Sequence, residues 1–299
     1  MEELVPCNEL LSRPSALKEQ ARQAGCLFFK RLVDRAALEV VRREILSLCA
    51  SAGWLAEGTD PMEGIAAPGV AHVEPQPAFM EVYDQVMRLE SFHSLAHDAG
   101  LLAAVRALFT EDVLVHPRNI ARIIFPHNVR FTTPAHQDYV HIQGTENTWT
   151  AWIPLGDCPR ALGGLAVMLG SHQNGVYPVH SAYGAGGLGI NTDVLPFPWA
   201  TADYQTGDVL LFHSLTVHKA LPNLTNDRLR LSTDFRYQPV SEPITEGSLM
   251  PHYARLSWEE IYAGWRSTRY QYYWRDLPLN IVEWSPHFHR SATPQEPGA

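Results

Sequence analysis

Apolar residues recur at helical spacing in the first third of the chain. Asp34, a residue type that caps helices, precedes apolar residues that stand three or four positions apart, which puts them on one helix face: Leu38, Val41, Ile45 and Leu48. We expect this helix to end at Gly53 and a second one to run from Leu101 to Phe109. Between them, the Gly-, Pro- and Ala-rich stretch 58–77 is typical of a loop. Residues 1–112 are therefore predicted to be a mostly helical support.

From about Val113 the pattern changes to short β-branched and aromatic runs separated by turn residues. These runs are 119–125, 147–155, 164–169, 209–212 and 230–237. Many short strands with intervening turns favour an antiparallel jelly roll. We predict a mainly β protein with flanking helices (α+β), whose sheet core spans 113–240 and carries an inserted Gly- and Pro-rich loop at 173–203.

The last segment, 241–299, is rich in aromatic residues and is predicted to be helical. Ser257 and Glu260 have the spacing of a capping box, and Trp258 to Trp274 contains most of the aromatic side chains. This tail either forms a lid over a substrate or packs into the core, and packing is the favoured interpretation. No internal repeat is visible, and we treat 1–299 as a single domain.

Composition excludes several classes of protein. With 45% hydrophobic and 18% charged residues the chain is ordinary globular protein, and a net charge of −9 without a basic cluster argues against nucleic acid as a partner. The scattered Cys7, Cys26, Cys49 and Cys158 predict neither disulfides nor a zinc ribbon. Since no 18-residue apolar run and no signal peptide are evident, we expect a cytoplasmic protein without a membrane span.

Histidines and one aspartate provide candidate metal ligands. In a strand, His136 and Asp138 would point to the same face while Gln137 faces away, although such a short pattern also arises by chance. Two further histidines, His213 and His218, follow the run 209–212. Two imidazoles and one carboxylate suit ferrous iron and leave open positions on the metal. His213, next to an apolar run, is better interpreted as a core histidine.

An arginine pair close behind these histidines suggests a binding site for a carboxylate. Arg230 and Ser232 share one face of a predicted strand, so that a guanidinium and a hydroxyl can bind one carboxylate together. A dicarboxylic co-substrate such as 2-oxoglutarate chelates iron through its 2-oxo acid end. Its other carboxylate then needs a bidentate cation in the water-free interior, which arginine supplies. Arg228 is interpreted as a solvent-facing strand residue.

The stretch Arg122–Tyr237 resembles the phytanoyl-CoA dioxygenase family of iron(II)- and 2-oxoglutarate-dependent oxygenases. The matching runs occur in the family's order: P-A-H-Q-D-Y at 134–139, T-A-W-I-P-L-G-D at 150–157, G-G-L-A-V-M-L-G-S-H at 163–172, G-D-V-L-L-F-H-S-L-T-V-H at 207–218 and R-L-S-T-D-F-R-Y at 230–237. The resemblance implies a double-stranded β-helix, a cupin-like jelly roll, with the iron inside one mouth.

Residue by residue, the resemblance assigns a site. His136, Asp138 and His218 match the iron ligands, Arg230 matches the 2-oxoglutarate arginine, and Trp152 matches a tryptophan beside the co-substrate. The family's arginine often follows its histidine slightly sooner, so Arg228 remains an alternative to Arg230. The implied cofactors are Fe²⁺, 2-oxoglutarate and O₂.

The implied reaction is oxidation, by default hydroxylation, of an unactivated C–H bond in a small metabolite, with release of succinate and CO₂. The carboxylate of Asp138 favours oxygen chemistry over halogenation, and the lack of a basic tract disfavours an acyl-CoA substrate. A small molecule of secondary or catabolic metabolism is the expected partner. Desaturation, epoxidation and cyclisation stay open, as do the substrate's identity and the oligomeric state.

Candidate substrate contacts follow the H-x-D motif or alternate with apolar residues in strands. They are Tyr139, His141, Gln143, Arg122 and Arg236, the two arginines being suited to an anionic group. Two other functions are considered. One is a cupin-type metal dioxygenase that needs no 2-oxoglutarate, in which Arg230 would have no purpose. The other is a non-catalytic small-molecule-binding barrel.

Overall fold

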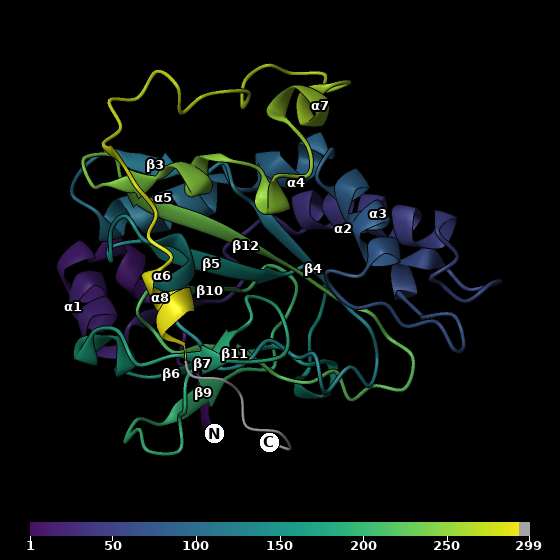
Figure 1. The fold of residues 1–299 in the computed structure, drawn as a ribbon, viewed down its shortest axis with the longest axis horizontal. Coiled ribbons are helices and arrows are strands. Elements are labelled where there is room, and N and C mark those ends of the chain that lie inside the picture. The colour runs from purple at the N-terminus through teal and green to yellow at the C-terminus, as the bar shows by residue number, and fades with distance from the viewer. Residues whose placement is uncertain (293–299) are drawn as a thin grey trace.

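A computed structural model describes residues 1–292, and two β-sheets lie at its centre (Figure 1). The larger sheet has the order β2-β10-β5-β12-β3, with β4 also paired to β12. Its strands are β2 (Cys26–Phe29), β3 (Val113–Val115), β4 (Ile120–Ile124), β5 (Trp149–Pro154), β10 (Val209–His213) and β12 (Arg230–Pro239). The long strands predicted from residues 113–240 are thereby confirmed.

The smaller sheet has the order β1-β9-β6-β11. Its strands are β1 (Glu2–Glu3), β6 (Leu165–Met168), β9 (Trp199–Thr201) and β11 (His218–Ala220). Strand β9 lies inside the stretch 173–203 that we expected to be a loop. That expectation was too broad, because a strand of three residues between turn residues carries no readable alternation. The same stretch holds the hairpin of β7 (His180–Ser181) and β8 (Leu188–Gly189).

The alternation of side chains along β12 divides the interior into two parts. Leu231, Phe235 and Tyr237 point into the main hydrophobic core, which β12 shares with the N-terminal helices. Ser232 and Arg236, at the intervening positions, point toward the other sheet. The inner face of the larger sheet is therefore polar along β12. On β2, β5 and β10 it carries apolar side chains, among them Phe28, Trp152 and Phe212, which pack against the smaller sheet in a second apolar core.

Helices cover the outer face of the larger sheet (Figure 1). Asp34 caps its helix through the amide of Ala36, as predicted. No helix within residues 1–292 combines the length and the apolar character that crossing a bilayer requires. The N-terminal helices are α1 (Pro14–Ala24), α2 (Arg35–Ser51), α3 (Pro77–Val86), α4 (Glu90–Leu95) and α5 (Ala99–Leu108), with 3₁₀ turns at Asn8–Ser12 and Pro61–Glu63.

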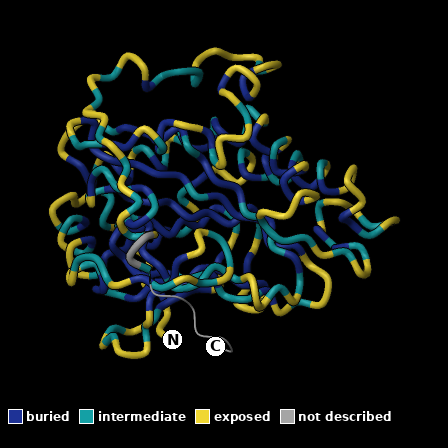
Figure 2. The backbone as a smooth tube through the Cα atoms, viewed as in Figure 1, coloured by how far each residue is buried: buried dark blue, intermediate teal, exposed yellow. Residues whose placement is uncertain are grey.

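The C-terminal tail is mostly irregular rather than helical, which corrects our expectation. Its aromatic side chains stabilise it by packing, and no repeating helical pattern is required. Trp258 and Trp274 are buried in the main core, whereas residues 266–269 between them are exposed (Figure 2). Residues 293–299 of the predicted tail lie outside the described residues. The described elements are β13 (Ile244–Thr245), which pairs with β14 (Ile281–Val282), the helices α7 (Trp258–Tyr262) and α8 (His287–Ser291), and 3₁₀ turns at Glu246–Leu249 and His252–Ala254.

Candidate active site

His136 and His218 are brought together by backbone pairing. The amide of each residue donates to the carbonyl of the other at 3.0 Å, which forms an isolated antiparallel bridge beside β11. Directly opposed residues in an antiparallel pair project their side chains to the same face. The two imidazole rings consequently lie 4.1 Å apart between their centroids. Two residues 82 positions apart in the chain become neighbours through one pair of hydrogen bonds.

Asp138 completes a group of three side chains that could hold a metal ion. Its Oδ1 lies 3.8 Å from Nε2 of His136 and 3.9 Å from Nε2 of His218. One ligand atom from each residue lies within 4.8 Å of the others. Asp138 has helical backbone angles at the start of α6 (Tyr139–Ile142), so our expectation of a continuous strand through the H-x-D motif was wrong. The turn into α6 nevertheless aims the carboxylate at the two imidazoles.

Backbone carbonyls orient both imidazoles. Nδ1 of His136 lies 2.8 Å from the carbonyl oxygen of Pro134, and Nδ1 of His218 lies 2.9 Å from that of Thr216. Because a carbonyl can only accept, each Nδ1 carries the proton and each Nε2 has a free lone pair. Burial lowers the pKa of both rings, that of His218 to about 3, and keeps them neutral. This is the ligand state that a divalent metal needs.

Thr150 and Arg236 hold the carboxylate of Asp138 from the side away from the histidines. The hydroxyl of Thr150 donates to Oδ2 at 2.7 Å, and the guanidinium of Arg236 lies 3.2 Å from the same atom. Burial alone would raise the pKa of Asp138, but the charge of Arg236, together with the hydrogen bond from Thr150, outweighs it and keeps that pKa below its usual range. Arg236 also donates to Oδ1 at 3.3 Å, and Oδ1 faces the two Nε2 atoms. We proposed Arg236 as a substrate contact, and in the structure it is bound to the candidate ligand.

Arg230 is buried and makes few hydrogen bonds, so it has donors available for the carboxylate of a ligand. One terminal nitrogen donates to the hydroxyl of Ser232 at 2.6 Å, while Nε has no hydrogen-bond partner within the described residues. A buried donor without a partner is costly, so a ligand is expected to supply one. Arg230 shares its pocket with the three candidate ligands and with Trp152. Arg228 is exposed and does not line that pocket.

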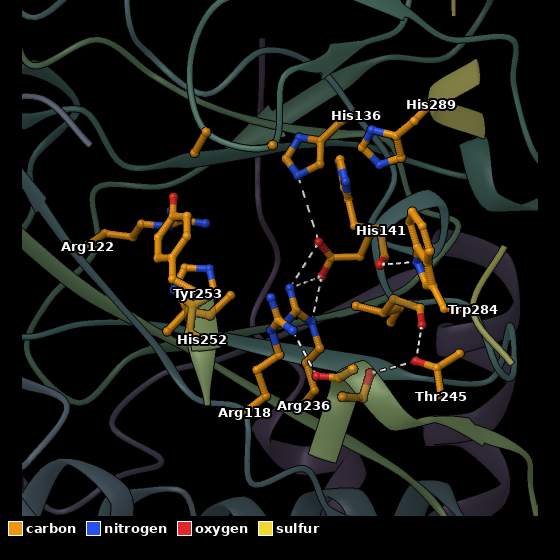
Figure 3. A pocket seen from close by; sticks show the side chains of 17 residues that line it. Arg118, Arg122, His136, His141, Arg236, Thr245, His252, Tyr253, Trp284 and His289 are labelled. Atoms are coloured by element: carbon orange, nitrogen blue, oxygen red, sulfur yellow. Dashed lines mark hydrogen bonds and ion pairs between the residues drawn. The ribbon is translucent and has the colours of Figure 1, made fainter. Parts of the chain in front are cut away.

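A second, larger cavity opens on the other side of Asp138. It has a volume of about 420 Å³ and is lined by His136, His141, Arg118, Arg236 and Trp284, among others (Figure 3). Its walls come from the start of the β-core, from α6 and from the C-terminal tail. A small molecule in this cavity would lie against the same carboxylate that the metal would bind.

Besides Arg236, two of the predicted substrate contacts line this cavity. His141 does so with a buried Nε2 that has no partner within residues 1–292, and burial lowers the pKa of its ring to about 3. Arg122 also lines it, but is paired with Glu74 at 2.8 Å and with Asp234 at 3.4 Å. Their roles as substrate contacts stay predictions.

The other two predicted contacts, Tyr139 and Gln143, interact with the C-terminal tail. The ring of Tyr139 packs against Phe288, with the centroids 6.2 Å apart. The amide of Gln143 donates to the carbonyl of Ser285 at 2.7 Å and accepts from its backbone N–H at 2.8 Å. Gln143 therefore acts as a tether for the tail, and its role as a substrate contact stays a prediction.

Sequence reasoning missed the cavity residues that lie in turns and in the tail. Arg118 stands between β3 and β4, Tyr253 lies in a 3₁₀ turn, and Trp284 follows β14. Segments without regular alternation do not reveal which way a side chain points. The one available signal was Arg118 itself, a lone charge in the run V-H-P-R-N-I at 115–120.

The C-terminal tail has two parts, and Trp284 lies in the second. The first part packs into the core through Trp258 and Trp274. The second part reaches the cavity, where the indole N–H of Trp284 donates to the carbonyl of His141 at 3.0 Å. Successive stretches of one tail thus pack into the core and line the cavity.

Comparisons with known proteins agree with this geometry. The model of the phytanoyl-CoA dioxygenase (PhyH) family matches residues 21–231. The 1-deoxypentalenic acid 11-beta-hydroxylase of Streptomyces arenae is 28% identical over 263 residues, which cover 82% of this chain and 88% of the relative. The enzyme of the same name from Streptomyces exfoliatus is 26% identical over 274 residues, with coverages of 84% and 90%.

Two solved structures are similar in fold. EvdO2 from Micromonospora carbonacea var. aurantiaca, complexed with 2-oxoglutarate, gives a TM-score of 0.51 at 16% identity, covering 80% of this chain and 94% of that one. The non-heme alpha ketoglutarate dependent carbocyclase SnoK from nogalamycin biosynthesis gives 0.50 at 20% identity, with coverages of 81% and 90%. These likenesses confirm the predicted fold class. Since the family model spans most of the chain, the protein belongs to the phytanoyl-CoA dioxygenase family, and the prediction of an oxygenase that depends on iron(II) and 2-oxoglutarate is confirmed.

Proposed function

We propose that His136, Asp138 and His218 hold the iron, that Arg230 and Ser232 hold the far carboxylate of 2-oxoglutarate, and that the enzyme hydroxylates a C–H bond of a small metabolite in the 420 Å³ cavity. The observation that carries the proposal is the convergence of two neutral Nε2 atoms on Oδ1 of one buried carboxylate. The two Streptomyces relatives are hydroxylases by name, which favours hydroxylation over desaturation, epoxidation or cyclisation.

The residues present fit the metal by their chemistry. Two imidazoles and a carboxylate on one side suit ferrous iron and leave positions for a co-substrate and for O₂. When bound, iron and 2-oxoglutarate supply the reduction of dioxygen, in which one oxygen atom enters succinate, the other enters the substrate as hydroxyl, and CO₂ is released. The protein's part is to bind and to orient. Pro134, Thr216 and Thr150 keep the three side chains aimed at one point.

The site for 2-oxoglutarate is enclosed and provides matching charge. Burial lowers the pKa of the Arg230 guanidinium, and among the residues described no carboxylate is paired with it. A dicarboxylate bound there would satisfy the open donors of Arg230 and would offset the cost of burying its charge. Trp152 and Phe212 line the same pocket and exclude water. A dioxygenase without 2-oxoglutarate would leave this arginine without a ligand.

The test is turnover that depends on all the proposed parts. We expect protein loaded with Fe²⁺ to release one succinate per hydroxylated product from a panel of small organic substrates. His136→Ala and Asp138→Ala should bind iron at least about tenfold more weakly and should lose turnover, because each removes a ligand. His213→Ala is the matched control, since His213 lies at the far end of β10 and packs against Trp149.

Two results would contradict the proposal. Iron affinity that survives His136→Ala and Asp138→Ala, or falls equally in His213→Ala, would place the metal elsewhere. Product formed without succinate would favour a dioxygenase that uses no 2-oxoglutarate.

A further inference from the structure

Three arginines line the large cavity, and two of them are already paired with carboxylates. Arg122 contacts Glu74 and Asp234, and Arg236 contacts Asp138. In each case the positive charge of the guanidinium is balanced inside the protein. These two residues are the arginines that the sequence pattern had suggested for an anionic substrate group.

Arg118 is different. Its guanidinium donates to the backbone carbonyl of Gly247 at 2.8 Å, and no Asp or Glu among residues 1–292 forms an ion pair with it. Arginine has five N–H donors, so this single bond leaves most of them available. Burial and the nearby charge of Arg236 both lower the pKa of Arg118. A carbonyl partner alone does not require a charge, because a neutral amide side chain would satisfy it at a lower cost of desolvation.

The position of Arg118 relates this free charge to the candidate iron site. Figure 3 shows Arg118 beside Arg236, across the cavity from His136. An anion bound at Arg118 would have the rest of its molecule inside the cavity, in reach of the metal ligands. The remaining wall is partly apolar, with Ile120, Ile142 and Trp284 among its residues.

We propose that Arg118 binds a carboxylate of the substrate and that the substrate class is small organic acids with an apolar body. The proposal rests on the proposed function, since it places that acid in the cavity beside the iron. A carboxylate matches the planar fork of a guanidinium, and the apolar body matches the apolar part of the cavity wall. One end of the substrate is thus fixed, which limits the C–H bonds that can face the metal.

The test compares acids with their uncharged amides. Wild-type protein loaded with Fe²⁺ and 2-oxoglutarate without oxygen is titrated calorimetrically with 1-adamantanecarboxylate, cyclohexanecarboxylate and the two matching primary carboxamides. We expect at least one acid to bind about 10- to 100-fold more tightly than its amide, the range of a charge-assisted contact. Arg118→Gln should abolish this preference, and Arg118→Lys should keep part of it.

Arg88→Gln is the matched control. Arg88 also donates to one backbone carbonyl, that of Glu260, but it is exposed and lies outside the cavity. This variant should keep the full preference for acids. Thermal melting verifies that Arg118→Gln is folded. If this variant does not fold, Arg118→Lys, which retains the charge and should keep part of the preference, provides the test.

Three outcomes distinguish the two proposals. If no acid binds wild-type protein better than its amide, or if Arg118→Gln keeps the preference, the assignment to Arg118 is overturned. If the preference depends on Arg118 while no substrate ever yields succinate, the anion site stands and the proposed oxygenation fails. If succinate forms but uncharged substrates are used equally well, oxygenation stands and the anion site falls.

Discussion

The single residues that matter most are held by partners the sequence pattern does not reveal. The three candidate ligands could be assigned from motifs, because H-x-D and a later histidine occur in the order of a known family. The pairing of Arg236 with Asp138 could not be predicted from motifs, because it joins β12 to the start of α6 across 98 positions and follows from the fold. The alternation of side chains along β12 indicates that Arg236 points to the inner face, but it does not indicate which acidic residue lies beside it.

Replacing Arg236 by methionine should destabilise the metal-free protein strongly. Asp138 and Arg236 are both buried, and removing one partner of a buried pair costs about 3–5 kcal/mol. Added Mn²⁺ or Fe²⁺ replaces part of the lost positive charge. The rise in melting temperature on metal addition should therefore be larger in Arg236→Met than in wild type.

Arg255→Met is the control for this comparison. Arg255 pairs with Asp84 at 2.9 Å on the surface, where such a pair contributes under about 1 kcal/mol. An Arg236→Met protein as stable as Arg255→Met without metal would show that Arg236 does not balance the charge of Asp138.

Arg230 and Arg228 give a second test at single residues. Arg230→Ala should raise the KM for 2-oxoglutarate at least about tenfold, because it removes a charged bidentate partner, and should leave the affinity for iron alone unchanged. Arg228→Ala, at an exposed position, should change neither quantity. Steady-state succinate release measures the KM, and titration with Fe²⁺ in the absence of 2-oxoglutarate and O₂ measures the affinity for iron. A larger effect at Arg228 would reverse the assignment.

At the scale of elements, long runs were predictable and short ones were not. Strands β5, β10 and β12 and helix α2 lie close to their predicted positions, because each contains enough residues to display its period. Strands β9 and β11 have three residues each, and β14 has two. Their pairing depends on partners elsewhere in the chain, which local spacing cannot show.

Gln143 links α6 to the second part of the tail and gives a prediction at this scale. Gln143→Ala removes both hydrogen bonds to Ser285, each worth about 1 kcal/mol. Amides at 281–289 should then exchange with deuterium roughly tenfold faster, while those of β12 stay protected. Gln271→Ala removes one exposed bond to Ser267 and is the control. Unchanged exchange at 281–289 would mean that Gln143 does not hold the tail.

For the whole molecule, the layers explain why a site can exist between the sheets. The helices and the outer face of the larger sheet form one apolar core, and apolar residues between the sheets form a second, smaller core beside the polar site. Buried charges in that site persist because each has a partner or awaits a ligand. The sequence predicted the layers from its change of period at about residue 113, but the two cavities and their separate walls required the structure.

The most direct measurement is anomalous diffraction from crystals grown without oxygen in the presence of Fe²⁺ and 2-oxoglutarate. The account predicts one iron atom bound by Nε2 of His136, Nε2 of His218 and the carboxylate of Asp138, with the far carboxylate of 2-oxoglutarate on Arg230 and Ser232. Iron bound without these three side chains, or 2-oxoglutarate bound away from Arg230, would contradict it.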